Sequence, residues 1–240
     1  MSFGDKSLLH SLTEFVPECA ILNAMDHLDV PAVLQAIAWL RVHASASAAG
    51  AHAFRLKDPL SDPEVAGFEQ KHGISLPSDY REFMTRVGNG GAGPFYGIFP
   101  LGYMDHNLDL RQWHENDGFV GMLSKPFSFQ DEWNDLSGMP KNLPDQNVPA
   151  YDKQIEVFEK TYWSSELMHG AIPICHRGCG LRIWLIVSGE QAGKLWEDRR
   201  SEYKGLSPVR LTNGSRATFG TWYREWLNNC FATAGQLKWP

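Results

Sequence analysis

Cysteine and histidine residues stand close together at one point of the chain. They form the run Cys175-His176-Arg177-Gly178-Cys179, and His169 precedes it. Thiolates and imidazoles are the usual zinc ligands, but a structural zinc site normally needs a second ligand pair at comparable spacing. The remaining cysteines, Cys19 and Cys230, are isolated in the sequence. We therefore predict no metal and no cofactor, and we interpret the run as a turn between two strands.

Catalysis by a cysteine or serine nucleophile is not favoured either. A thiolate needs a base beside it, and His176 adjoins Cys175 on a predicted strand, where neighbouring side chains point to opposite faces. The sequence contains no Gly-x-Ser-x-Gly elbow and no His-Glu-x-x-His helix. The glycines Gly88, Gly90 and Gly93 have the spacing of a dinucleotide loop, but they follow a predicted helix instead of a strand. We predict that the protein is not an enzyme.

Nine tryptophans leave one other function open. Aromatic rings bind sugars, and two of the 28 acidic residues could meet in space as a carboxylate pair for glycoside hydrolysis. Trp222 and Trp226 lie on the apolar stripe of a predicted helix, and Trp184 and Trp196 lie in predicted strands. Core packing is the interpretation that we favour. A carbohydrate-binding or hydrolytic protein with a Trp-rich cleft stays as an alternative.

The composition is that of an acidic globular protein. The chain has 240 residues, with 22 Lys and Arg against 28 Asp and Glu, and its formal net charge is −6. This balance argues against direct binding to nucleic acid or to an anionic membrane. No apolar run approaches the ~20 residues that a membrane span needs, and the first residues lack the pattern of a signal peptide. We expect a cytoplasmic protein.

The charge is concentrated in the middle of the chain. Residues 101–160 carry 5 basic and 11 acidic groups, a balance of −6, whereas residues 161–240 carry 10 basic and 6 acidic groups. One interpretation is a solvated, loop-rich surface. The other is an acidic face that attracts a basic protein partner. The candidate contact residues on such a face are Asp105, Asp109, Glu115, Asp117, Asp131, Glu132 and Asp135.

Helical patterns occur at both ends of the chain. Apolar residues recur at helical spacing from Asp29 to Leu40, and a small-residue stretch follows. Further helices are predicted from Asp62, as the N-cap, to Gly73, and from Ser78 to Val87. The last helix is expected to begin at a Thr218 cap and to present an apolar stripe as far as Phe231.

Strand patterns fill the region between these helices. Two successive hairpins are predicted over residues 171–196, because branched and aromatic runs alternate there with glycine-containing turns. Residues 94–101 are also strand-like, a short helix is expected near residues 108–116, and residues 151–164 fit a helix or a strand. Helices first, strands in the middle and a helix last predict an α+β fold, with a mainly antiparallel β-sheet flanked by helices.

Several of these motifs, taken in order, resemble one known family. Leu76-Pro77-Ser78-Asp79-Tyr80 is followed by Gly88-Asn89-Gly90-Gly91, and later by Ile172-Pro173-Ile174 and Gly178-Cys179-Gly180. With the terminal aromatic helix, this ordered set resembles the SMI1/KNR4 (SUKH) superfamily over about residues 58–232. The resemblance implies three parts: an N-terminal helical extension and linker over 1–57, the SMI1/KNR4-like domain over 58–232, and a C-terminal tail over 233–240.

The resemblance also implies a function. Many bacterial members of this superfamily are immunity proteins that bind and neutralise polymorphic toxins, often nucleases, without catalysis. Similar fungal domains regulate cell-wall synthesis through protein contacts, and a regulatory or scaffolding role is therefore the alternative. The family motifs build turns and core, so they transfer no contact residue. The expected partner is a toxin domain, and the sequence leaves open whether the protein also forms a homo-oligomer.

Overall fold

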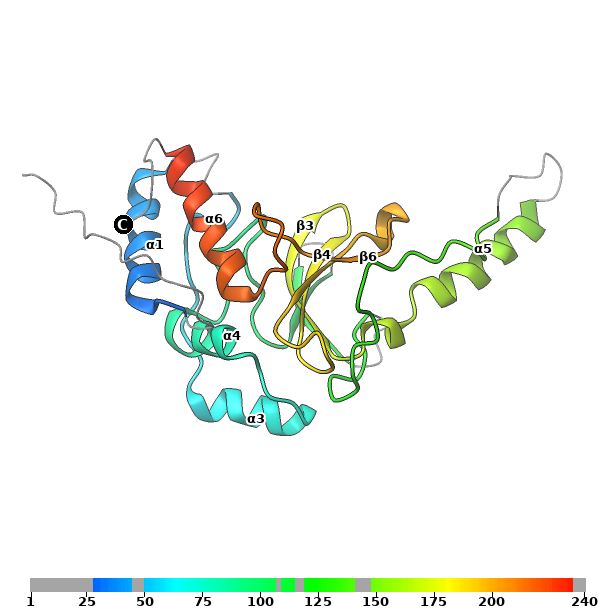
Figure 1. Cartoon of the computed structure of the whole chain (residues 1–240), viewed down its shortest axis with the longest axis horizontal. Helices are drawn as coiled ribbons and strands as arrows, with labels where there is room; N and C mark the ends of the chain where they lie inside the picture. Colours follow the sequence, from blue (N-terminus) through cyan, green and yellow to red (C-terminus); the bar gives the residue numbers. More distant parts are fainter. Residues whose placement is uncertain (1–27, 45–49, 107–108, 115–118, 141–147, 235–240) are drawn as a thin grey trace, which may run out of the picture.

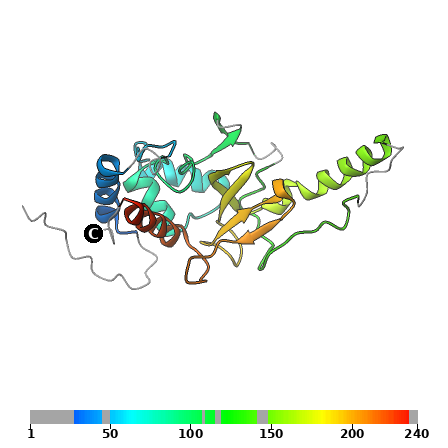
Figure 2. The same cartoon turned by 90° about the horizontal axis from the view of Figure 1, so that it is seen from above.

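The predicted α+β fold is confirmed by the computed structural model. It describes residues 28–44, 50–106, 109–114, 119–140 and 148–234, and over these residues it contains five α-helices and two antiparallel sheets. The helices are α1 (Val30–His43), α3 (Asp62–His72), α4 (Ser78–Glu82), α5 (Val148–Tyr162) and α6 (Phe219–Thr233). Helices α1, α3, α4 and α6 gather on one side of the larger sheet, and α5 projects from the opposite side (Figures 1 and 2).

The larger sheet confirms the two predicted hairpins. Its strands are β3 (Ala171–Gly178), β4 (Leu181–Ile186), β5 (Leu195–Asp198) and β6 (Leu206–Pro208), in that order and all antiparallel. Trp184 and Trp196 stand directly opposite each other on β4 and β5, and both are buried. All of residues 183–186 are buried, so both faces of the sheet are covered.

The two terminal helices pack against each other. Asp29 caps α1 by accepting a hydrogen bond from the Ala32 amide at 3.1 Å, and Thr218 caps α6 as predicted. The rings of Trp39 and Phe231 stack with their centroids 4.8 Å apart, and Leu40 is fully buried. The described part of the N-terminal extension therefore shares the core of the main domain. The division of the chain at residue 57 stays a prediction.

The N-cap of α3 lies one residue before the predicted cap, Asp62, which is instead the first residue of the helix. Ser61 is the N-cap of a capping box. Its hydroxyl oxygen accepts from the Glu64 amide, and the Glu64 carboxylate accepts from the Ser61 amide. Gly73 ends the helix in the left-handed conformation. Helix α4 continues as a π-helical turn, η1 (Phe83–Val87), which ends at a glycine-rich turn. Gly91 has φ +104°, and a Cβ there would lie 2.4 Å from the Arg55 carbonyl oxygen.

The middle of the chain forms a small ribbon where a helix was expected. Strands β1 (Tyr103–His106) and β2 (Asp109–Gln112) pair antiparallel, with Met104 opposite Arg111. The expectation of a short helix near residues 108–116 is thus wrong over Asp109–Gln112. A helix over these residues would have few apolar side chains to bury on one face. Pairing with β1 instead gives the backbone N–H and C=O groups their hydrogen bonds directly.

Helix α5 resolves the ambiguous region in favour of a helix and forms an arm. Its buried residues are Phe158 and Tyr162, near its C-terminal end, while the Val157 side chain is 63% exposed. The Tyr162 hydroxyl donates to Asn134 Oδ1 at 2.6 Å and accepts from the Gly205 amide at 3.0 Å. The arm is therefore anchored at one end, and most of its length projects (Figure 1).

Candidate protein-binding surface

The tip of the β3–β4 hairpin has an unusual backbone. Gly178, Cys179 and Gly180 have φ values of 99°, 51° and 78°, so three consecutive residues are left-handed. Cys179 is exposed, and its carbonyl oxygen accepts a hydrogen bond from the Ser201 hydroxyl at 2.8 Å. A hairpin tip twisted in this way holds its side chains at fixed angles to the sheet.

Two exposed aromatic rings lie beside this tip. Phe95 and Tyr96 are 46% and 48% exposed, and Phe95 has a φ of 57°, which is strained for a bulky side chain. The Arg177 guanidinium lies 4.5 Å from the centre of the Phe95 ring. The Tyr96 amide donates to the His176 carbonyl at 3.3 Å. The sheet thus holds both rings in place.

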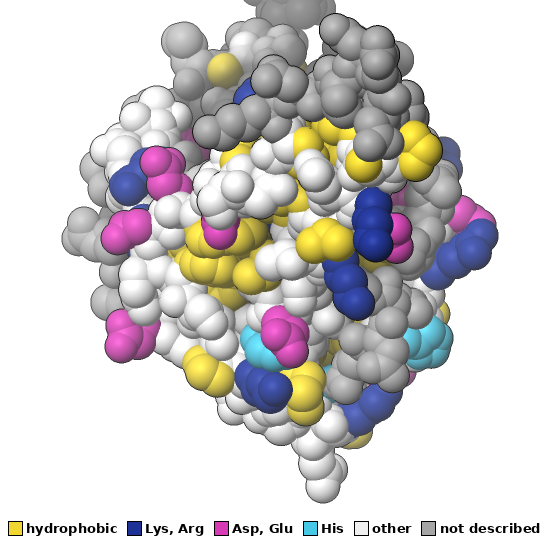
Figure 3. All heavy atoms as spheres, turned by 90° about the vertical axis from the view of Figure 1, so that its right-hand side faces the viewer, with side chains coloured by type: hydrophobic (Ala, Val, Ile, Leu, Met, Phe, Trp, Pro, Cys, Tyr) yellow, Lys and Arg dark blue, Asp and Glu magenta, His cyan; other side chains and the backbone are white. Residues whose placement is uncertain are grey.

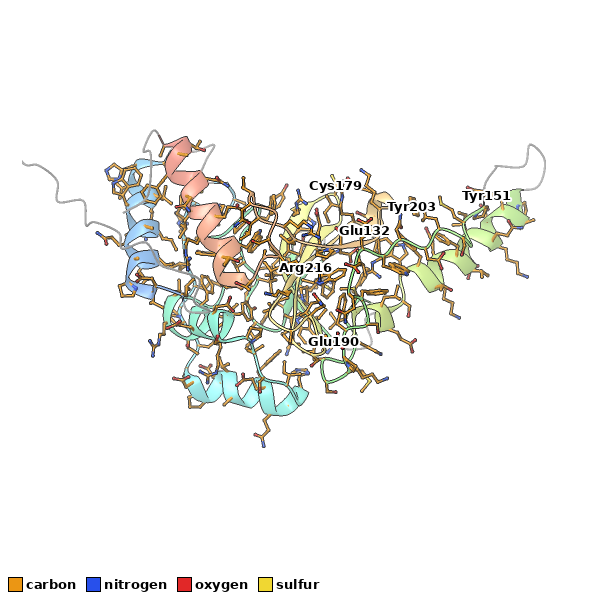
Figure 4. All side chains as sticks on the ribbon, viewed as in Figure 1. Glu132, Tyr151, Cys179, Glu190, Tyr203 and Arg216 are labelled. Carbon is orange, nitrogen blue, oxygen red and sulfur yellow. The ribbon has the colours of Figure 1, made fainter. Side chains whose placement is uncertain are left out.

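A short 3₁₀ turn, η3 (Arg200–Glu202), extends the same surface. It ends at Tyr203, another non-glycine residue with a positive φ, of 54°. The Tyr203 carbonyl accepts a hydrogen bond from the Asn134 side chain at 2.9 Å, which places residues 132–135 beside the turn. We call the hairpin surface the set of residues Phe95, Tyr96, Arg177, Cys179, Ser201 and Tyr203. Figure 4 shows Cys179 and Tyr203 on one side of the molecule, and Tyr151 out along the arm.

A cavity opens next to the hairpin surface, where α5 leaves the body. Its volume is about 580 Å³. The Arg182 guanidinium lies 5.6 Å from the Phe119 ring centre, and the Phe119 and Trp163 rings meet edge to face at 6.5 Å. We call it the arm-base cavity; its lining residues are Phe119, Glu159, Lys160, Trp163, Gly180, Arg182 and Ser201. Aromatic walls with a few polar or charged groups are typical of a concave binding site.

A buried ion pair fixes the base of the arm. Asp198 and Arg200 form a two-pronged contact, with Nε to Oδ1 at 3.0 Å and Nη2 to Oδ2 at 2.7 Å. Arg200 also donates to the Tyr162 carbonyl at 3.3 Å, and its guanidinium lies 4.9 Å from the Trp163 ring centre. One side chain therefore joins β5, η3 and the end of α5 into a rigid unit.

A second group of buried polar side chains supports the hairpin. His176 Nδ1 lies 3.0 Å from Oδ2 of Asp105, and Arg182 donates to the Asp105 carbonyl at 3.3 Å. Burial lowers the pKa of His176, and the Arg182 charge lowers it further against the opposing effect of Asp105. Burial likewise lowers the pKa of Arg182. At neutral pH the neutral form of His176 is thus favoured beside a carboxylate and a guanidinium.

A family model described as SMI1 / KNR4 family (SUKH-1) matches residues 59–206. The chain belongs to the SMI1/KNR4 family. The match covers the hairpin surface and the arm-base cavity, while α6 lies beyond it. Searches against curated proteins and against solved structures returned no match. Over the described residues, none of the helices combines the length and apolarity that crossing a bilayer requires.

The predicted acidic contacts of this SMI1/KNR4 family member are scattered. Asp105 is buried against His176, and Asp109 lies 3.3 Å from Arg111. Asp131 is exposed but lies 2.9 Å from Arg216. Glu132 and Asp135 are exposed and flank Asn134, so they lie near the hairpin surface. The Ser137 hydroxyl and amide lower the pKa of Asp135 by hydrogen bonding. Glu115 and Asp117 lie outside the described residues.

The tryptophans and cysteines of this family member serve mainly as core. All eight tryptophans within the described residues are buried or half-buried, which does not favour an open Trp-rich cleft. No group of three His, Cys, Asp or Glu side chains that could hold a metal occurs in the part of the chain that the structure describes. Burial raises the pKa of Cys175 well above its usual range and that of Cys230 to about 11, so both thiols stay protonated at neutral pH.

Sequence reasoning predicted the turn at the tip of the β3–β4 hairpin but missed the exposed rings beside it. The strand-like pattern of residues 94–101 gave no reason to expect exposed rings at Phe95 and Tyr96. A positive φ at Phe95, Cys179 or Tyr203 leaves no trace in residue type, because glycine is the residue expected there. The only available hint was Pro94, since proline often begins a turn.

Proposed function

We propose that this protein is a non-catalytic immunity module that acts in the cytoplasm by binding a toxin domain through the hairpin surface and the arm-base cavity. The observation that carries the proposal is the pair of exposed rings, Phe95 and Tyr96, which a strained turn holds beside the β3–β4 hairpin. Family membership supports it, because the SMI1/KNR4 domain is known as an immunity-like module.

The composition of the hairpin surface favours protein binding. Aromatic residues and arginine are enriched at protein interfaces, and a few buried anchors carry most of the affinity. Side chains that are already fixed lose little entropy when a partner binds. Phe95 beside Arg177 fits both conditions. Figure 3 looks at the end of the molecule from which α5 projects, and shows hydrophobic side chains in the middle of that face with basic side chains beside them.

The acidic residues support the choice of partner. Glu132 and Asp135 are exposed near Tyr203, at the edge of the hairpin surface. Charges at an interface rim attract a partner of opposite sign and mainly accelerate association. A basic toxin domain, such as a nuclease, would approach such an edge faster than a neutral protein would. In this proposal the rings supply the affinity and the acids supply the encounter rate.

The direct test measures binding to toxin domains encoded in the same genome, beginning with any in the neighbourhood of this gene. Replacing both rings, Phe95→Ser with Tyr96→Ser, should weaken binding at least about a hundredfold, because two central anchors are lost. The matched control is Val42→Ser, since Val42 is an exposed apolar residue on α1, away from the hairpin. Calorimetric affinity and survival of cells that express the toxin are the two measurements.

Two results would contradict the proposal in different ways. Unchanged affinity of the double variant, with protection intact, would place the interface elsewhere on the molecule. Failure of the unmodified protein to bind or to protect against any of these toxin domains would reject the immunity role, and a regulatory or scaffolding role would then be the better account.

A further inference from the structure

We propose that Asn213 is a site of spontaneous chemical modification, at which its side-chain amide is lost as ammonia and an aspartyl or isoaspartyl residue is left. Asn213 is followed by Gly214 and Ser215. These residues lie at the tip of a short hairpin, which is closed by an antiparallel bridge between Arg210 and Arg216. The proposal does not depend on toxin binding.

The reaction needs only the chain itself and water. The backbone nitrogen of Gly214 attacks Cγ of Asn213, a bond forms between these two atoms, and the bond from Cγ to Nδ2 breaks. The proton of the attacking nitrogen is given up, and Nδ2 leaves as ammonia from the cyclic imide that results. Water then opens this ring at the side-chain carbonyl, which gives an aspartyl residue, or at the main-chain carbonyl, which gives an isoaspartyl residue. Glycine favours the attack because it places no side chain beside the nitrogen.

The turn presents this dipeptide to solvent. The Gly214 amide donates to the Leu211 carbonyl at 2.8 Å, and Gly214 has a φ of +82°, so a left-handed glycine follows the turn, as in many hairpin loops. Residues 212–215 are all exposed, and no described atom lies within 4 Å of a Cβ built at Gly214. Exposed turns at the end of a hairpin open at low cost, which lets the Gly214 nitrogen leave Leu211 and reach Asn213.

Two hydrogen bonds polarise the group that is attacked. Asn213 Oδ1 accepts from the Ser215 amide at 3.0 Å and from the Ser215 hydroxyl at 2.7 Å. This oxygen gains negative charge during the attack, and donors aimed at such an oxygen stabilise the charge. Arg210 Nη1 donates to the Gly214 carbonyl at 2.9 Å, and its positive charge favours loss of the proton from the nearby nitrogen.

The chain contains a second Asn-Gly pair, Asn89 and Gly90, that lacks these properties. Asn89 Oδ1 accepts from the Leu101 amide at 2.8 Å, and the Asn89 amide donates to the Asp58 carbonyl at 3.2 Å. Gly90 is buried, and its carbonyl accepts from the Lys57 amide at 3.1 Å. Contacts with two other segments thus hold this pair closed. The two pairs have the same residue types, and the fold makes only Asn213 reactive.

The modification changes both the charge and the backbone of the hairpin. It adds one negative charge to a chain whose formal net charge is −6, and the isoaspartyl form also lengthens the main chain. The Thr212 amide donates to Glu225 Oε1 at 2.8 Å, which ties the hairpin to α6. Arg216 donates to the Gln130 carbonyl at 2.6 Å and to Asp131 at 2.9 Å. An isoaspartyl residue at the tip therefore weakens the links from the hairpin to α6 and to residues 130–131.

The test incubates the full chain in warm neutral buffer for several weeks, once folded and once in urea. Trypsin cuts after Arg210 and Arg216, so residues 211–216 form one peptide, and mass spectrometry detects a product heavier by about 1 Da. Labelling by an isoaspartyl methyltransferase identifies the isoaspartyl form. In the folded chain we expect Asn213 to convert at least about tenfold faster than Asn89. In urea the two rates should agree within about threefold, because only the fold distinguishes the two pairs.

Variants connect the rate to the turn. Asn213→Gln should give no product in the peptide of residues 211–216. Ser215→Ala should slow the conversion of the folded chain about threefold or more, because one donor to Oδ1 is lost. Ser124→Ala removes an exposed hydroxyl elsewhere and should change nothing. Circular dichroism checks that each variant is folded.

Three results would count against the proposal. It is rejected if Asn213 of the folded chain stays unmodified, or if Asn89 of the folded chain converts as fast as Asn213. An unchanged or higher rate in Ser215→Ala would reject the part assigned to the Ser215 hydroxyl.

Discussion

The acidic middle segment and the hairpin surface differ in how well the sequence indicates what each exposes in the folded protein. Residues 101–160 have a balance of −6, yet Asp105 is buried, and Asp109 and Asp131 lie beside arginines. Arg216, which pairs with Asp131, comes from 85 residues further along the chain. The hairpin surface has little to mark it in the sequence but exposes aromatic rings on a fixed frame. Charge counted along a segment therefore overstates the field that the folded segment presents.

The buried pair of Asp198 and Arg200 gives the sharpest contrast with the exposed acids of residues 101–160. Asp198→Asn would leave a buried guanidinium without its counter-charge, so we expect a loss of about 3–5 kcal/mol in the free energy of unfolding. Asp109→Asn, on the exposed ribbon, should leave the urea midpoint unchanged. Urea denaturation followed by tryptophan fluorescence measures both. Equal effects would mean that the pair does not secure the base of the arm.

The next largest effect on stability is expected at Gly205, where Trp133 of the middle segment meets the start of β6. The φ of Gly205 is +68°, and a Cβ there would lie 1.9 Å from the Trp133 carbonyl oxygen. Gly205→Ala should therefore cost about 2–4 kcal/mol in stability. Gly214 is the matched control, because it also has a positive φ but nothing lies within 4 Å of its Cβ position. Thermal unfolding of the two variants should separate backbone strain from steric clash, and similar losses would refute the clash.

The acidic edge should act on rate more than on affinity. Glu132→Lys with Asp135→Lys is expected to slow association with a basic toxin domain about three- to tenfold at low salt, and the dissociation rate should stay the same. Surface plasmon resonance at two salt concentrations gives both rates. If the variant instead dissociates faster, the acids are anchors, and the division of roles between rings and acids is wrong.

The smallest effect concerns acid sensitivity. His169 Nδ1 accepts from the Met122 amide at 3.0 Å, and burial together with Lys125 lowers the His169 pKa, against a weaker opposing effect of Glu166. Because the folded pKa lies below the unfolded value of about 6.5, the unfolded state binds more protons and stability falls as pH drops through that value. This loss of stability reaches its full size once the pH is below the pKa of His169 in the folded protein.

His169→Gln tests this contribution, because an amide oxygen can accept from Met122 without gaining a proton. The fall in Tm between pH 7.5 and pH 5.5 should be smaller in the variant by about 1–2 °C. An equal or larger fall in the variant would show that His169 does not contribute. Other groups, including His176, would then account for the acid sensitivity of the whole protein.

Much of the fold was predictable because it depends on local patterns. The Thr218 cap, the Gly73 stop and the two hairpins follow from residue type and spacing, and the structure confirms them. Strand β2 was not predictable, since its four residues are exposed and only its pairing with β1 defines it. The candidate binding surface was harder to predict than the fold. Its strained backbone and its buried ion pair both result from tertiary contacts that no short window of sequence contains.

The one-sided anchoring of α5 has a consequence for how the protein can change. None of residues 149–154, on the projecting half of this 15-residue helix, is buried, and surface changes usually shift stability by less than about 0.5 kcal/mol. Residues 149–154 can therefore vary in shape and charge while Phe158, Tyr162 and Arg200 keep the scaffold intact. A protein built in this way tolerates sequence change in its outermost helical turns at almost no cost to its own folding.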